Sequence, residues 1–195
     1  MYGEPLSVSI LEVKRCFVLS DKVKGCAGRD QSRFRHCVDE QKVLVGQMSE
    51  QQLDHDLPAV GPRSRVDDYN QRSWIHDTVS VDATQIFAGA GELPVHLTLG
   101  TVRQVAAKIA RNLANIPPCR GKSAIPGIIS MAPVITSERL LSVIALPTND
   151  PYPPQNPSIR WHLDDGSMRA IGLAMARNDT LSAYIGASPT RPARS

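Results

Sequence analysis

The residues best suited to chemistry form one short segment, Asp165-Gly166-Ser167-Met168-Arg169. Glycine tolerates backbone angles that other residues avoid, so Asp165-Gly166 predicts a turn. Ser167 can then cap a helix by accepting a hydrogen bond from an early backbone N–H group. A helix N-terminus attracts anions, and an arginine guanidinium binds phosphate oxygens in pairs. We therefore predict a phosphate-binding loop made of Asp165, Gly166, Ser167 and Arg169. The alternative is a plain turn in which the arginine pairs with an aspartate.

Acidic and imidazole side chains beside this loop suggest two further roles. The carboxylate of Asp164 or Asp165 is a suitable oxygen ligand for Mg²⁺. His162 and Asp164 are two residues apart in an expected strand, so they share a face and could form an acid–base pair. A histidine satisfied at the strand surface is the interpretation that we favour. We assign no catalytic residue.

A strand and a helix must hold the loop in place. Ile159, Trp161 and Leu163 alternate with polar residues, which predicts a half-buried strand. After the loop, the apolar residues between 168 and 175 recur at helical spacing. Further strands are expected at 78–81, 127–135, 140–146 and 181–186.

The clearest helix is expected after Thr101, where apolar residues recur at helical spacing from Val102 to Leu113. Its polar side carries three basic residues, Arg103, Lys108 and Arg111. This basic face could contact DNA phosphates, although a solvated helix face is the commoner explanation.

The N-terminal half is expected to differ from the rest. Residues 7–13, 16–20 and 42–45 are interpreted as strands, which makes 1–46 a small β-rich segment. Residues 47–72 are interpreted as a linker or mobile loop with one short helix near 50–55. Residues 73–187 then form an α/β domain, and 188–195 a flexible tail. The expected fold class is α+β, with a mixed β-sheet and a few helices.

Composition limits the classes of protein to consider. The chain has 195 residues, a formal net charge of +3, and 42% hydrophobic residues, enough for a buried core. The charge is short of the excess typical of dedicated nucleic-acid-binding domains. No apolar run approaches the ~20 residues of a membrane span, and residues 1–6 lack the layout of a signal peptide. We therefore expect a cytoplasmic protein with no membrane partner.

Other groups of potential ligands are weaker candidates. The four cysteines contain no Cys-x-x-Cys pair, so reduced thiols are expected in that compartment. Their spacings match no zinc pattern even when His36 is added, and we predict no metal site. The acidic and histidine residues Asp54, His55 and His76 resemble those of metal-dependent nucleases, but a solvated loop is the preferred interpretation. The four cysteines are Cys16, Cys26, Cys37 and Cys119.

The strand, the Asp-Gly-x-x-Arg segment and the helix containing Gly172 resemble the ParB/sulfiredoxin-like superfamily, including its Asp-Gly-Gln-His-Arg type. The resemblance covers at most residues 95–187. In that superfamily this turn and helix bind the phosphates of CTP, ATP or ADP. The resemblance therefore implies CTP or ATP with Mg²⁺ as cofactor, and an association with DNA in a phage or plasmid. Ser167 and Met168 replace side chains on which the family's catalysis depends, so the chain is not assigned an enzymatic activity.

Two hypotheses of function remain open. The leading one is a ParB-like nucleotide-binding protein associated with DNA. The alternative is a non-enzymatic structural or interaction protein, such as a virion component or an inhibitor of a host enzyme. It is motivated by the proline-rich loops and by an N-terminal half that the resemblance does not cover. A homo-oligomer is compatible with either hypothesis.

Overall fold

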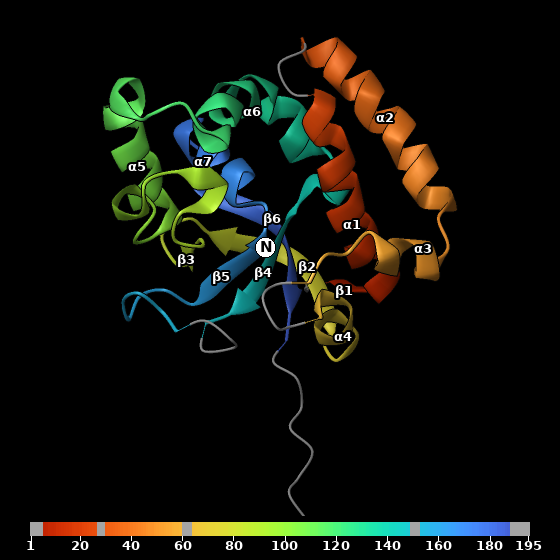
Figure 1. Ribbon diagram of the computed structural model, residues 1–195. Helices are drawn as coiled ribbons and strands as arrows, with labels where there is room; N and C mark the ends of the chain where they lie inside the picture. Colours follow the sequence, from red (N-terminus) through yellow and green to blue (C-terminus); the bar gives the residue numbers. More distant parts are fainter. Residues whose placement is uncertain (1–5, 27–29, 60–63, 149–152, 188–195) are drawn as a thin grey trace, which may run out of the picture.

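The computed structural model describes residues 6–26, 30–59, 64–148 and 153–187, which form an α+β fold (Figure 1). Its centre is a six-stranded mixed sheet with the strand order β1-β2-β6-β4-β5-β3. The strands are β1 (Leu6–Val8), β2 (Trp74–Ser80), β3 (Thr84–Gln85), β4 (Val143–Pro147), β5 (Trp161–Asp165) and β6 (Thr180–Gly186). The predicted fold class is therefore confirmed.

The strand pairing explains how the candidate loop is placed. Strand β6 is antiparallel to β2 and parallel to β4, and β4 is antiparallel to β5. Between β4 and β5 the register shifts, because Asp165 lies opposite Ile144 while Leu163 lies opposite Ala145. Asp164 is thus the extra residue of a β-bulge, a feature that redirects side chains locally. The bulge occurs immediately before the loop.

The N-terminal part is helical, and its predicted strands are wrong. Among the described N-terminal residues, 6–26 and 30–46, Leu6–Val8 alone pairs as a strand. The rest of 7–13 runs into α1 (Ile10–Lys22), which also contains 16–20. Residues 42–45 belong to α2 (Gln31–Gln47). In α1 the buried residues include Val13, Cys16, Phe17 and Ser20, which follow helical spacing. The short windows of apolar residues did not distinguish this spacing from strand alternation.

Two short helices occupy the segment predicted to be a linker. Helix α3 (Glu50–His55) confirms the expected helix and begins with a capping box between Ser49 and Gln52. Helix α4 (Arg65–Asn70) follows. The fully buried ammonium of Lys14 joins α1 to α3, with Nζ 2.7 Å from Glu50 Oε1 and 2.6 Å from Asp54 Oδ1. This segment is therefore packed against the N-terminal helix.

Three longer helices accompany the sheet in the C-terminal half. Helix α5 (Val102–Asn112) confirms the helix predicted after Thr101, and α7 (Ser167–Met175) confirms the one after the candidate loop. The strand expected at 127–135 is wrong, because these residues belong to α6 (Arg120–Ser137). The two prolines inside α6, Pro126 and Pro133, are unusual in a helix interior, which obscured the helix in the sequence.

Short 3₁₀ helices complete the secondary structure. They are η1 (Val23–Cys26), η2 (Ala90–Glu92), η3 (Val95–Leu97), η4 (Leu113–Asn115) and η5 (Arg139–Leu141). Strands β2, β4, β5 and β6 lie close to where the sequence predicts strands. The predicted tail at 188–195 lies outside the described residues.

The helices pack in two groups. In Figure 1, α5, α6 and α7 lie together at the upper left and top of the view, and α1, α2 and α3 lie together at the right. Helix α7 contacts both α5 and α6, while α2 contacts both α1 and α6. A disulfide joins Cys26 at the end of η1 to Cys37 in α2, so the prediction of reduced thiols is wrong for this pair. Cys16 and Cys119 are free thiols. No helix within the described ranges is long and apolar enough to cross a membrane.

Candidate functional site

The candidate loop begins α7 with a glycine cap. Gly166 is the N-cap residue with φ 92° and ψ 15°, and no side chain makes a capping hydrogen bond. The predicted capping role of Ser167 is therefore wrong: Ser167 is the first helical residue. A Cβ at position 166 would lie 2.8 Å from Val143 Cγ1 and 2.9 Å from Arg169 Nη2. Glycine is required here both by the left-handed angle and by this close packing.

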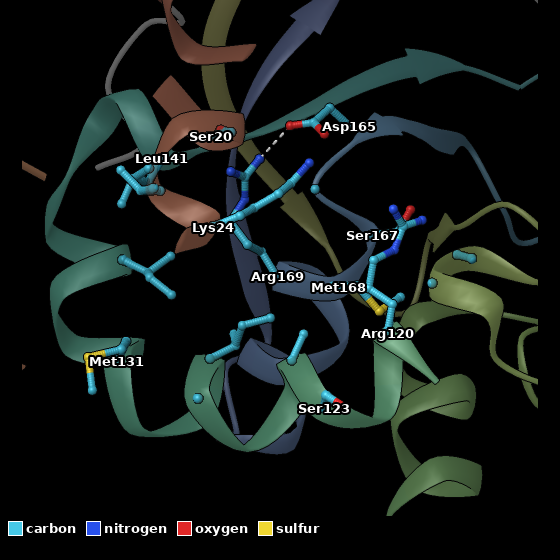
Figure 2. A pocket seen from close by; sticks show the side chains of 18 of the residues that line it. Ser20, Lys24, Arg120, Ser123, Met131, Leu141, Asp165, Ser167, Met168 and Arg169 are labelled. Carbon is cyan, nitrogen blue, oxygen red and sulfur yellow. Dashed lines mark hydrogen bonds and ion pairs between the residues drawn. The ribbon is translucent and has the colours of Figure 1, made fainter. Parts of the chain in front are cut away.

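All five residues of the loop line a cavity of about 530 Å³ (Figure 2). Helix α6 forms one wall, and further lining residues come from the end of α1, η1, α2, η2, η5 and the end of β5. A cavity of this size is typical of small-molecule sites. The tertiary structure thus places the predicted loop at a concave site.

Two further cations line the same cavity, and sequence reasoning missed both. Lys24 comes from η1 and Arg120 from the first turn of α6. Lys24 Nζ lies 2.7 Å from Asp21, and Arg120 Nε lies 4.0 Å from Glu92, in pairs whose side chains are all more than half exposed. Exposed pairs of this kind contribute little stability, so a ligand can displace them at low cost. Neither residue belongs to a recognisable motif, so no sequence signal indicated them.

Arg169 combines an internal ion pair with an unused donor. Its Nη2 donates to Asp165 Oδ2 at 2.7 Å and to the Ser142 carbonyl oxygen at 3.3 Å. The pairing that we gave as the alternative therefore exists. However, Arg169 Nε is buried and has no hydrogen-bond partner within the part of the chain that the structure describes. A buried guanidinium N–H without an acceptor is energetically unfavourable.

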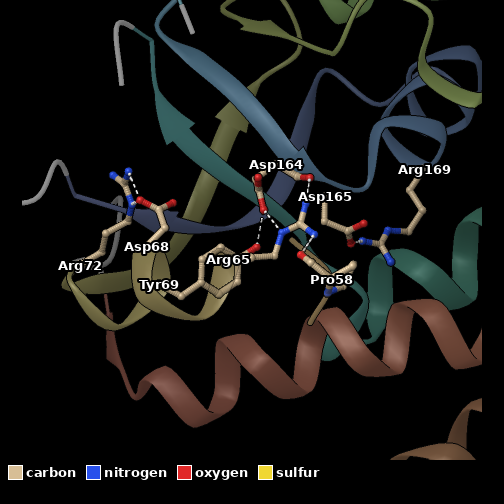
Figure 3. Close-up of polar contacts among 8 residues, drawn as sticks. All are labelled: Pro58, Arg65, Asp68, Tyr69, Arg72, Asp164, Asp165 and Arg169. Atoms are coloured by element: carbon tan, nitrogen blue, oxygen red, sulfur yellow. Dashed lines mark hydrogen bonds and ion pairs between the residues drawn. The ribbon is translucent and has the colours of Figure 1, made fainter. Parts of the chain in front are cut away.

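Asp164 and Asp165 pair with different arginines, Asp164 with Arg65 and Asp165 with Arg169, as Figure 3 shows. Asp164 Oδ2 accepts hydrogen bonds from Arg65 Nε at 2.7 Å and from the Tyr69 hydroxyl at 2.5 Å. Burial, together with the adjacent carboxylate, raises the pKa of Tyr69, which keeps the hydroxyl as a donor. Asp164 is therefore part of a buried polar cluster with α4.

This arrangement limits how Mg²⁺ could be held. Asp164 is occupied by Arg65 and Tyr69, which leaves Asp165 as the nearby carboxylate that lines the cavity. Among the described residues, no group of three or more His, Cys, Asp or Glu side chains could hold a metal ion. Magnesium commonly binds through one or two carboxylates and the phosphates of a substrate. Asp165 Oδ2 is itself paired with Arg169 at 2.7 Å, so a magnesium ion here would have to be held mainly by the phosphates of a bound nucleotide, with Asp165 as the nearest carboxylate that lines the cavity.

His162 and Asp164 do not form the acid–base pair that we considered. His162 is buried with its Nδ1 3.3 Å from Gln85 Nε2, and its ring makes an edge-to-face contact with Phe87. Burial lowers the pKa of His162 to about 4, so the imidazole is neutral at physiological pH. The histidine is thus held in the interior and not at the strand surface.

The other candidate residues are separated from one another in the fold. Asp54 pairs with Lys14 on the N-terminal helix. His76 lies on β2, where its Nε2 is 3.0 Å from both Ser142 Oγ and Ser182 Oγ. Asp54, His55 and His76 therefore form no metal-binding cluster in the described structure.

The basic residues of α5 are engaged in local contacts. Arg103 pairs with Asp82 at 2.8 Å and with Asp179 at 2.7 Å, and these carboxylates raise its pKa. Lys108 Nζ donates to the Leu99 carbonyl oxygen at 2.9 Å, and Arg111 Nε to that of Ala107 at 3.2 Å. At 100° per residue, Arg103 and Lys108 point about 140° apart around the helix axis. The three side chains therefore do not form one narrow basic stripe.

Comparison with protein-family models, with characterised proteins and with solved structures found no match for this chain. The resemblance to the ParB/sulfiredoxin-like superfamily therefore stays a prediction. The site is defined by its own geometry: a glycine-capped helix N-terminus and three cations around one cavity.

Proposed function

We propose that this protein binds a small phosphate-bearing ligand in the cavity beside the α7 N-terminus. The observation that carries the proposal is the convergence of Lys24, Arg120 and Arg169 on the cavity that the Asp165–Arg169 loop lines. These cations come from three distant parts of the chain. A nucleotide such as CTP or ATP with Mg²⁺ is the ligand that the sequence resemblance implies.

The α7 backbone supplies part of the proposed site. Helix α7 has nine residues, and its N-cap leaves the first amides without a side-chain acceptor. Such amides and the positive end of the helix dipole favour a bound anion. Gly166 adds no side chain that would obstruct the approach of a phosphate to these groups.

The three arginine and lysine side chains supply the charge. Asp165 neutralises part of Arg169, whereas the acidic partners of Lys24 and Arg120 do not line the cavity. A phosphate group can exchange with those exposed partners and gain charge-assisted hydrogen bonds. The expected binding is therefore electrostatic and weaker at high salt.

Calorimetric titration of the protein with CTP, ATP, ADP and inorganic phosphate, each with Mg²⁺, tests the proposal. We expect binding by at least one phosphate compound, weakened about tenfold or more in Lys24→Ala and Arg120→Ala, since a charge-assisted hydrogen bond is worth roughly 1.5–3 kcal/mol. Both side chains are exposed, so the fold should survive. Lys108→Ala, outside the cavity, is the matched control. Failure of every ligand to bind, or equal binding by all variants, would overturn the proposal.

An association with DNA is a separate proposal that rests on Arg103, Lys108 and Arg111. The contacts of these residues favour it less, because Arg103 already has two carboxylate partners. Fluorescence anisotropy with duplex DNA tests it at two salt concentrations. Binding that Lys108→Ala and Arg111→Ala leave unchanged would exclude this face as the DNA contact.

A further inference from the structure

The cavity beside α7 has two ends of different character. Six of its lining residues are apolar side chains that are almost completely buried: Val23, Phe34, Ile128, Met131, Ile135 and Leu141. Figure 2 places Met131 and Leu141 on one side of the cavity and Arg120 and Ser167 on the other. Lys24 and Arg169 lie between these two sides, and Arg169 Nη2 is 3.3 Å from the carbonyl oxygen of Ser142, the residue after Leu141. Met131, on α6, lies away from the labelled cations. A ligand whose charged group meets the cations would therefore place its other end against the apolar side chains of α6.

The apolar end offers few partners to a polar ligand. Apart from the groups of the loop and the cations, the polar side chains that line the cavity are the hydroxyls of Ser20 and Ser123 and the carboxylate of Asp164, which is paired with Arg65. A nucleobase carries several N–H and C=O groups that need partners when they leave water. Two hydroxyls satisfy only part of that requirement, whereas a hydrocarbon requires none.

We propose that the ligand is an amphipathic anion, with a phosphate head at the cations Lys24, Arg120 and Arg169 and a hydrocarbon body against the α6 side chains around Met131. This inference rests on the proposed function, because it names the class of phosphate-bearing ligand that the same cavity takes. Charge complementarity places the head, and burial of apolar surface holds the body. The binding energy then depends on the length of the hydrocarbon.

Alkyl phosphates of increasing length measure that dependence directly. Each CH₂ group moved from water into an apolar site gains up to about fourfold in affinity, the equivalent of roughly 0.8 kcal/mol. Calorimetric titration with butyl, hexyl and octyl phosphate, below their micelle concentrations, should therefore show a steep rise in affinity. Octyltrimethylammonium has a matched chain and a cationic head, and it should not bind.

Two variants connect the expected trend to this cavity. Met131→Gln keeps the side-chain length but places an amide at the apolar end. This substitution should lower the affinity for octyl phosphate several-fold and leave the affinity for inorganic phosphate unchanged. Thermal unfolding checks that the variant folds. Met48→Gln, on a partly buried methionine outside the cavity, is the control. Lys24→Ala should weaken all the alkyl phosphates by a similar factor.

The outcomes separate this inference from the proposed function. Steeply rising affinity along the series, with no binding of the ammonium compound, supports the inference. Tighter binding of CTP or ATP than of octyl phosphate, or an affinity independent of chain length, overturns it and leaves phosphate binding intact. If neither nucleotides nor any phosphate compound binds, both proposals fail.

Discussion

The Asp164 carboxylate accepts a hydrogen bond from Arg65 Nε at 2.7 Å, and both side chains are 8% exposed. Arg65 also donates to the Pro58 carbonyl oxygen at 3.0 Å and lies 4.6 Å from the Phe17 ring centroid. This contact ties α4 and the segment before it to the strand that ends at the candidate loop. The polar cluster therefore stabilises the base of the site.

Removal of Arg65 should strongly destabilise the fold. Arg65→Ala leaves the Asp164 carboxylate buried without its cation, and breaking a buried pair costs about 3–5 kcal/mol. Urea unfolding of the variant measures the loss in free energy. Arg103→Ala, which breaks exposed pairs, is the comparison and should cause a much smaller loss. Equal effects of the two substitutions would contradict the assigned role of Arg65.

Gly172 should tolerate no larger side chain, because α7 lies against α6 there. A Cβ at this position would clash with Ile128, which lines the cavity. Gly172→Ala should cost about 1–3 kcal/mol through overpacking and should also weaken ligand binding. Thermal unfolding and the phosphate titration measure the two effects.

Gly46 is the control for Gly172, because both glycines lie within helices but only Gly172 is tightly packed. A Cβ there has nothing within 4 Å, and the residue belongs to α2. Gly46→Ala should therefore stabilise the protein by up to about 1 kcal/mol, because alanine has the higher helix propensity. Destabilisation by Gly46→Ala would show that the backbone at α2 differs from the described one.

The buried His162 should make stability fall in mild acid. Its pKa is about 4 in the folded protein, against an ordinary value of about 6.5 in the unfolded chain. The unfolded state therefore takes up the proton first. The contribution of neutral His162 to the free energy of unfolding is fully present above about pH 6.5 and is lost as the pH falls through about 4. The difference between the two pKa values corresponds to roughly 3 kcal/mol of unfolding free energy.

Urea unfolding between pH 7 and 4 tests this dependence. His162→Gln should flatten the decline in unfolding free energy relative to the wild type. Burial also lowers the pKa of His76, which contributes in the same direction, so some decline should remain. An identical pH profile for His162→Gln and the wild type would exclude the proposed linkage.

The disulfide between Cys26 and Cys37 should stabilise the N-terminal helices. It joins two residues with a sequence separation of 11. A cross-link lowers the entropy of the unfolded chain, and for a loop of that length this raises the free energy of unfolding by about 3 kcal/mol. A thiol reductant should therefore lower the Tm of the wild type. The double variant Cys26→Ser, Cys37→Ser should already have the lower Tm and should not respond to reductant. Four reactive thiols in the denatured, unreduced protein would show that the bond is absent.

Local patterns in the sequence were sufficient for several elements. Thr101 as a cap residue and the amphipathic spacing after it predicted α5, where the structure shows a capping box with Gln104, and Asp165-Gly166 predicted the turn before α7. These features depend on neighbouring residues along the chain. The same local logic misread α1 and α6, because short apolar runs fit a strand or a buried helix equally well.

The sequence by itself therefore determined the α+β class and the turn at Gly166, which follow from local backbone preferences and patterning, and a cation at Arg169, which follows from the residue type. Only the tertiary structure decided which charges meet. It paired Asp164 with Arg65 and brought Lys24 and Arg120 to the cavity beside α7. Such meetings depend on the packing of helices that are distant along the chain, and no local spacing encodes them. The loop at Asp165–Arg169 was already a predicted phosphate-binding segment; the packing added the cavity beside it and two further cations.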